Sequence, residues 1–155
     1  MEHGPNCDCS GYKFGSVLYM SDCVGLSAES RALIGLPASL PGPATDTARQ
    51  PGSTQPGPAV ELTVLDSLLP QGKHVSHWCW PQARDFIHEL RPKQAVLIGM
   101  SHSWTQEIID SVEKDDLGPE VSVRVGHDGQ RIPLTSLVVR HPWESSNKNS
   151  DAPSV

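Results

Sequence analysis

Metal-competent side chains follow two short apolar runs of this sequence. Asp22 ends the run at residues 17–21, and His102 comes soon after the run at residues 94–98. Ligands of open α/β sheets gather beyond the carboxyl ends of the strands, so Asp22 and His102 would face one rim if their strands are parallel neighbours. Imidazole and carboxylate are both zinc ligands. The spacing indicates a metal site at that rim, although an aspartate at a strand end also serves as an ordinary turn or cap residue.

Two further histidines are candidates for the same site. His3 precedes Gly4 near the N-terminus, in a segment expected to fray. His77 closes the stretch His74-Val75-Ser76-His77, which lies between an expected strand and an expected helix. A loop histidine beside Trp78 is the alternative interpretation of His77. The remaining histidines have weaker claims, because they fall on a solvated helix face, in a loop and in the tail: His88, His127 and His141.

The four cysteines are too few and too unevenly spaced for a secreted disulfide framework. Cys7-Asp8-Cys9 follows His3 closely, and thiolate with imidazole is a zinc-binding combination. A C-x-C spacing without a second cysteine pair favours free thiols instead. We therefore expect reduced cysteines and a cytoplasmic protein.

The elements that must position these residues alternate between strand and helix patterns. Residues 12–14 and 17–21 predict a hairpin across Gly15-Ser16, and residues 61–65 and 94–98 predict further strands. A helix is expected from about Trp80 to Arg91-Pro92, and a second runs to about Lys114 from a capping box of Ser103 and Gln106. Residues 121–125 alternate in polarity, and residues 131–133 are expected to return as a strand after Asp128-Gly129. This order predicts an α/β fold with a parallel pair joined by a crossover.

Composition limits both the folded part of the chain and its partners. Residues 39–58 are rich in proline and glycine and predict a disordered insertion, and residues 144–155 predict a disordered tail. The formal net charge is −6, and acidic and basic residues are interspersed along the chain. They form no basic stripe that would bind a nucleic acid. No apolar run is long enough to cross a bilayer, and the N-terminus has no signal-type pattern.

Several short stretches, taken in order, resemble the second half of the metallo-β-lactamase superfamily, in its branch of phosphodiesterase-like putative hydrolases. That branch is similar to the cyclic phosphodiesterase of phosphonate breakdown and, more distantly, to tRNA-maturing zinc endonucleases. The resemblance covers about residues 3–134 apart from the insertion, and divides the half-domain into residues 1–38 and 59–143. It rests on His3-Gly4-Pro5-Asn6-Cys7-Asp8-Cys9, Gly11-Tyr12-Lys13-Phe14-Gly15, Tyr19-Met20-Ser21-Asp22, Leu65-Asp66, His74-Val75-Ser76-His77, Leu90-Arg91-Pro92-Lys93 and Gly99-Met100-Ser101-His102.

The resemblance implies a role for each candidate. His3 matches the middle metal-binding histidine of the family, Asp22 the aspartate that bridges two metal ions, and His102 the last histidine ligand. His77 matches a non-ligand histidine that contacts the scissile phosphate or protonates the leaving group. Val75 replaces the proline usual in that motif. Two zinc ions would activate a water and stabilise charge on the attacking and leaving oxygens.

The family's His-x-His-x-Asp-His motif does not occur in these 155 residues. With two protein ligands per metal, one of them shared, we expect weak or absent zinc binding and a truncated, inactive hydrolase. The expected fold is the C-terminal half of a four-layer αββα sandwich. Its uncovered sheet face would favour self-association or pairing. The alternative is a non-catalytic binding or regulatory module that pairs with an intact homologue.

Overall fold

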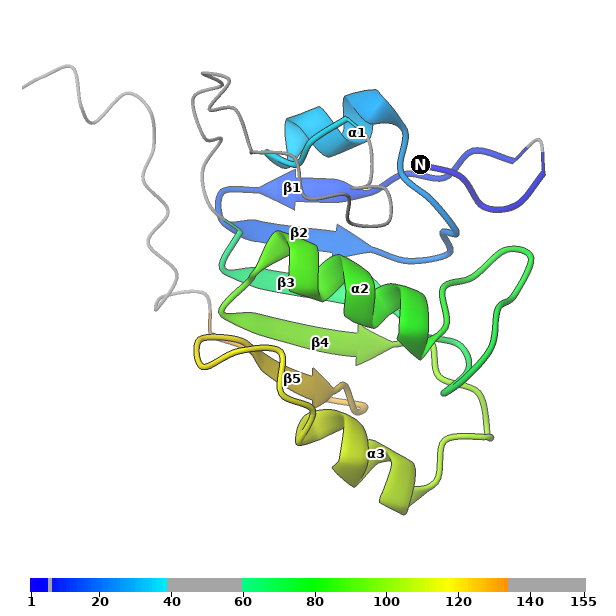
Figure 1. The fold of residues 1–155 in the computed structure, drawn as a ribbon, viewed down its shortest axis with the longest axis vertical. Coiled ribbons are helices and arrows are strands. Elements are labelled where there is room, and N and C mark those ends of the chain that lie inside the picture. Colours follow the sequence, from blue (N-terminus) through cyan, green and yellow to red (C-terminus); the bar gives the residue numbers. More distant parts are fainter. Residues whose placement is uncertain (6, 39–59, 134–155) are drawn as a thin grey trace, which may run out of the picture.

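The part of the chain that the structure describes folds around one five-stranded sheet with three helices (Figure 1). The computed structural model describes residues 1–5, 7–38 and 60–133. Strand β1 is antiparallel to β2, and the neighbours from β2 to β5 pair in parallel. The strands follow the order β1-β2-β3-β4-β5 and span Tyr12–Phe14, Val17–Met20, Leu62–Asp66, Gln94–Ile98 and Ser122–Val125. This confirms the predicted α/β class, the hairpin and the parallel strand-helix-strand unit.

The main core lies between one face of the sheet and the helices α2, Trp80–Leu90, and α3, Gln106–Glu113, and apolar residues flanking α1, Ala28–Leu33, pack against it. Figure 1 shows α2 lying across β3 and β4. Its apolar stripe, Ala83, Phe86 and Ile87, joins Val112 of α3 in the cluster that includes the inward-facing strand residues. Burial against helices explains why the parallel strands are almost continuous apolar runs. The strand members are Leu18, Met20, Leu65, Ala95, Leu97 and Val123.

The opposite face of the sheet forms a second apolar cluster. Val17, Leu62 and Val96 are at most 4% exposed, and within the described residues only strand side chains and Ile132 join them. Phe14 pairs with Val17 across the hairpin and is 51% exposed, and Tyr12 is 61% exposed. The expectation of an uncovered sheet face is therefore wrong for its centre, which is buried, and apolar side chains are exposed only at the β1 edge of the described strands.

Helix α2 matches its predicted limits, but α3 begins differently from the prediction. In α2 the backbone N–H of Cys79 donates to the Gln82 side chain at 3.1 Å, and Arg91 ends the helix in a left-handed conformation. The predicted capping box at Ser103 is wrong, because Thr105 is the N-cap and accepts from the N–H of Ile108. The Gln106 side chain, which the box would direct toward Ser103, donates to Asp110 instead.

Three other segments depart from the sequence expectations. The predicted return strand at residues 131–133 is wrong: the chain turns between His127 and Gln130 and forms no strand there. Strand β3 extends to Asp66, because Asp66 pairs with Ile98 in the register with β4. Helix α1 was not predicted, although Ser27 caps it. The predicted disordered insertion, residues 39–58, and tail, residues 144–155, lie outside the described residues.

Within the described residues, no helix has the length and apolar character that a membrane span requires.

Candidate metal centre

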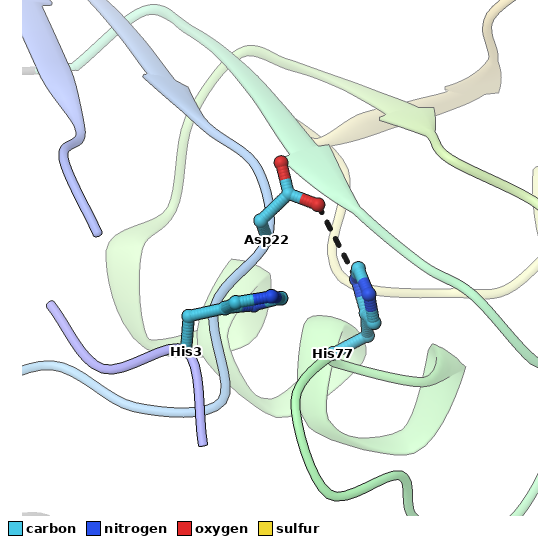
Figure 2. Close-up of side chains that lie close together, drawn as sticks. All are labelled: His3, Asp22 and His77. Carbon is cyan, nitrogen blue, oxygen red and sulfur yellow. Dashed lines mark ion pairs between the residues drawn. The ribbon is translucent and has the colours of Figure 1, made fainter. Parts of the chain in front are cut away.

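Three side chains from separate segments converge beyond the carboxyl ends of β2 and β3. Figure 2 shows the rings of His3 and His77 beside the carboxylate of Asp22. One potential ligand atom of each residue lies within 4.8 Å of those of the other two. Asp22 follows β2, His77 lies between β3 and α2, and His3 belongs to the N-terminal segment. Because β2 and β3 are parallel neighbours, their carboxyl ends lie side by side, as expected for a ligand site of an open α/β sheet.

The N-terminal segment is held in place by backbone pairing. Glu2 donates to the carbonyl of Gly25 at 3.1 Å and accepts from Val24 at 2.7 Å, so residues 1–3 lie along the chain that leaves β2. Cys9 donates to the carbonyl of Met1 at 3.1 Å on the other side. The expectation that His3 lies in a fraying end is therefore wrong for this structure.

Backbone contacts also fix His3 and the loop that carries His77. The Nδ1 atom of His3 lies 2.8 Å from the carbonyl oxygen of Ser76. A carbonyl only accepts, so Nδ1 carries the proton and Nε2 of His3 keeps its lone pair. The loop is closed at its base by Leu68, whose N–H donates to the carbonyl of Trp78 at 2.8 Å. The two imidazole rings meet edge to face, with centroids 5.0 Å apart.

Asp66 is the site residue that sequence reasoning did not assign. Its carboxylate lies 2.7 Å from Nδ1 of His77, and its side chain is only 3% exposed. Burial raises the pKa of the Asp66 carboxyl, and the hydrogen bond from His77 opposes that shift. With its Nδ1 proton donated to Asp66, His77 keeps a lone pair on Nε2. Carboxylates orient metal-binding histidines in this way.

Asp22 supplies the exposed carboxylate of the cluster. Its side chain is 59% exposed, and Oδ1 lies 3.7 Å from Nδ1 of His77, the contact drawn as a dashed line in Figure 2. Ser21 donates its hydroxyl to Oδ2 at 3.0 Å. The backbone of Asp22 has a φ of 54°, which is uncommon for a residue with a side chain and is found most often at functional sites and turns.

The other sequence candidates stand apart from this cluster. His102 is exposed in the turn after β4, and the cluster of potential ligands does not include it. Cys7 is exposed and Cys9 half-buried, and neither belongs to a metal-competent group of three within the described residues. The structure therefore brings together His3, Asp22 and His77, and it does not bring His102 to them.

Gly99 gives Asp66 the space that it needs. A Cβ at Gly99 would lie 2.6 Å from Oδ1 of Asp66, and the φ of Gly99 is +69°. We expect Gly99→Ala to displace the Asp66 carboxylate and to lower the free energy of unfolding by about 1–3 kcal/mol in urea titrations. Gly129→Ala is a matched control, since Gly129 has a φ of +75° but an added Cβ would contact nothing within 4 Å. Equal losses in the two variants would contradict the proposed clash.

Comparison with known proteins supports the fold. No protein-family model and no curated protein matches the chain. Among solved structures it is similar to one described as a new diphosphatase from the PhnP family, with a TM-score of 0.52 and 19% sequence identity. The similarity covers 79% of this chain and 37% of that protein, so this chain spans well under half of the neighbour. The five-stranded sheet with its helices is consistent with a partial metallo-β-lactamase fold.

Proposed function

We propose that this chain is the C-terminal half of a metallo-β-lactamase-type hydrolase that acts on phosphodiesters, and that it retains part of the metal site. One observation carries the proposal: two imidazoles, each with its Nδ1 held by a fixed acceptor, converge with an exposed carboxylate. The fold likeness to a diphosphatase of the PhnP family supports the hydrolase class. The phosphodiester substrate rests on the resemblance of the sequence motifs.

The residues fit a zinc ion. Catalytic zinc sites commonly use three protein ligands and leave one position open, and two histidines with one carboxylate form such a set. In His3 and His77 the Nδ1 atom is held by an acceptor, Ser76 and Asp66 respectively, which leaves Nε2 of each ring as the nitrogen with a lone pair for the metal. A bound zinc supplies Lewis-acid chemistry, which activates water and polarises a phosphoryl oxygen.

This ligand set gives His77 a role that the sequence motifs do not assign to it. In the chain alone, His77 would complete the zinc site with His3 and Asp22. Where a His-x-His-x-Asp-His segment completes the metal centre, we propose that His77, oriented by Asp66, is free to contact the phosphate or protonate the leaving group. His102 would then serve as the last ligand of a second ion.

Two measurements on the purified chain test this proposal. A zinc titration with chelator competition, measured by calorimetry, gives the affinity and the number of bound ions, and an assay on bis-p-nitrophenyl phosphate gives the turnover. We expect one zinc ion to bind weakly per chain, without turnover, because the His-x-His-x-Asp-His ligands do not occur in its sequence. Absence of zinc binding would contradict the proposed metal site. Two bound ions with turnover would overturn the proposal that the chain alone is inactive.

A second candidate is a non-catalytic module that pairs with an intact homologue or with itself. It is favoured by the apolar sheet face opposite the helices, where Phe14 and Tyr12 remain exposed at the β1 edge. The partial coverage of the solved neighbour also fits a half-domain that needs a partner. A chain that binds no zinc but sediments as a dimer would favour this function over the hydrolase.

A further inference from the structure

A third imidazole lies beside the candidate metal centre. The ring of His74 is exposed, and its centroid is 5.4 Å from that of His77. His74 is not a member of the metal-competent cluster formed by His3, Asp22 and His77. The proposed hydrolase function has therefore left this residue without a role.

The peptide groups of Ser76 give His74 and His3 opposite tautomers. The carbonyl oxygen of Ser76 lies 2.8 Å from Nδ1 of His3, so that nitrogen must donate. The backbone N–H of Ser76 donates to Nδ1 of His74 at 3.4 Å, so that nitrogen must accept. A neutral imidazole has one N–H, and in His74 it is therefore on Nε2. The Ser76 hydroxyl, 3.3 Å from the same Nδ1, is compatible with this assignment because it can donate as well.

The opposite tautomers imply different ligands. His3 and His77 each keep a lone pair on Nε2, which suits a cation, whereas His74 keeps an N–H there, which suits an anionic oxygen. The ring centroids of His3 and His74 lie 5.0 and 5.4 Å from that of His77, so a phosphate bound at His77 would lie beside both neighbouring rings.

We propose that His74 binds substrate by donating a hydrogen bond from Nε2 to a non-bridging oxygen of the phosphodiester. This inference rests on the proposed function and adds a substrate-binding residue to it. The exposed position of His74 leaves its Nε2–H available to a ligand that arrives from solvent. The neighbouring Lys73 adds positive charge to the same exposed loop.

Nitrogen NMR of the histidine side chains tests the tautomers directly. In the zinc-free chain we expect His3 and His77 to carry the proton on Nδ1 and His74 to carry it on Nε2. Zinc should shift the Nε2 resonances of His3 and His77 and leave the His74 tautomer unchanged. A His74 proton on Nδ1 would overturn the inference, whether or not zinc binds.

Binding of dimethyl phosphate tests the contact itself, in both zinc-free and zinc-loaded protein. We expect His74→Phe, which keeps a ring but removes the donor, to weaken binding about tenfold, and His74→Gln, which restores an N–H, to recover part of the loss. His88→Phe is the matched control, because His88 is exposed on α2 and outside the cluster. Unchanged affinity in His74→Phe would overturn the inference. If His74→Phe still binds zinc normally, the proposed metal site is retained even though the inference about His74 is wrong.

Discussion

We expect the Asp22→Asn variant to bind zinc at least about a hundredfold more weakly than the unchanged chain. Removing a residue that only hydrogen-bonds to a metal ligand already weakens metal binding about 10–100-fold, and Asp22 is itself a proposed ligand. The substitution removes the negative charge of the only exposed carboxylate in the His3, Asp22 and His77 cluster. Asparagine tolerates the left-handed backbone found at Asp22, where φ is 54°, so the fold should be retained. Calorimetric zinc titration measures the affinity, and urea unfolding verifies that stability is unchanged.

His102→Ala provides the control for that experiment. His102 is exposed and outside the cluster, so its removal should leave the affinity for the first zinc ion unchanged. A large loss in His102→Ala with little change in His77→Ala would instead favour the ligand set that the family resemblance implies. Normal zinc binding by Asp22→Asn would contradict the proposed centre.

The sheet could be predicted from local sequence because each strand is a short apolar run next to a clear turn or helix signal. Val17–Met20 and Gln94–Ile98 are of this kind, and both occur as strands. The start of α3 was missed because Ser103 and Thr105 both have suitable side chains for a cap. Only the three-dimensional course of the turn before the helix, where Trp104 donates to the carbonyl of Ser101, decides between them.

The site could be predicted only in part, since strand order decides which ends meet. Asp22 and His102 follow similar apolar runs, but β2 and β4 are separated by β3, and it is the end of β3 that lies next to Asp22. Asp66 stands at that end. The signal for it was present in Leu65-Asp66, an apolar strand that ends in a carboxylate, yet its hydrogen bond to His77 joins residues 11 positions apart through a loop. No periodicity encodes such a contact.

The core beneath the site contains a titratable group of its own. Cys23 follows Asp22 directly, is 0% exposed and belongs to the main apolar cluster. Burial raises the pKa of its thiol from 9.0 to about 12, and the nearby Cys9 and Asp66 add to the shift. Since the raised pKa belongs to the folded state, the thiol is protonated in both states below pH 9, and unfolding releases a proton at higher pH.

This linkage predicts a loss of stability in alkali that depends on Cys23. Between pH 9.0 and 12 the folding equilibrium constant should fall by up to about tenfold per pH unit, or about a hundredfold by pH 11, through this one thiol. Urea unfolding of the metal-free chain and of Cys23→Ala over this range measures the effect. The variant loses a buried side chain and starts less stable, but the other titrating groups are common to both proteins, so the difference in slope isolates Cys23. Parallel curves above pH 9 would show that the thiolate forms in the folded core at little cost, contrary to the burial that the structure gives it.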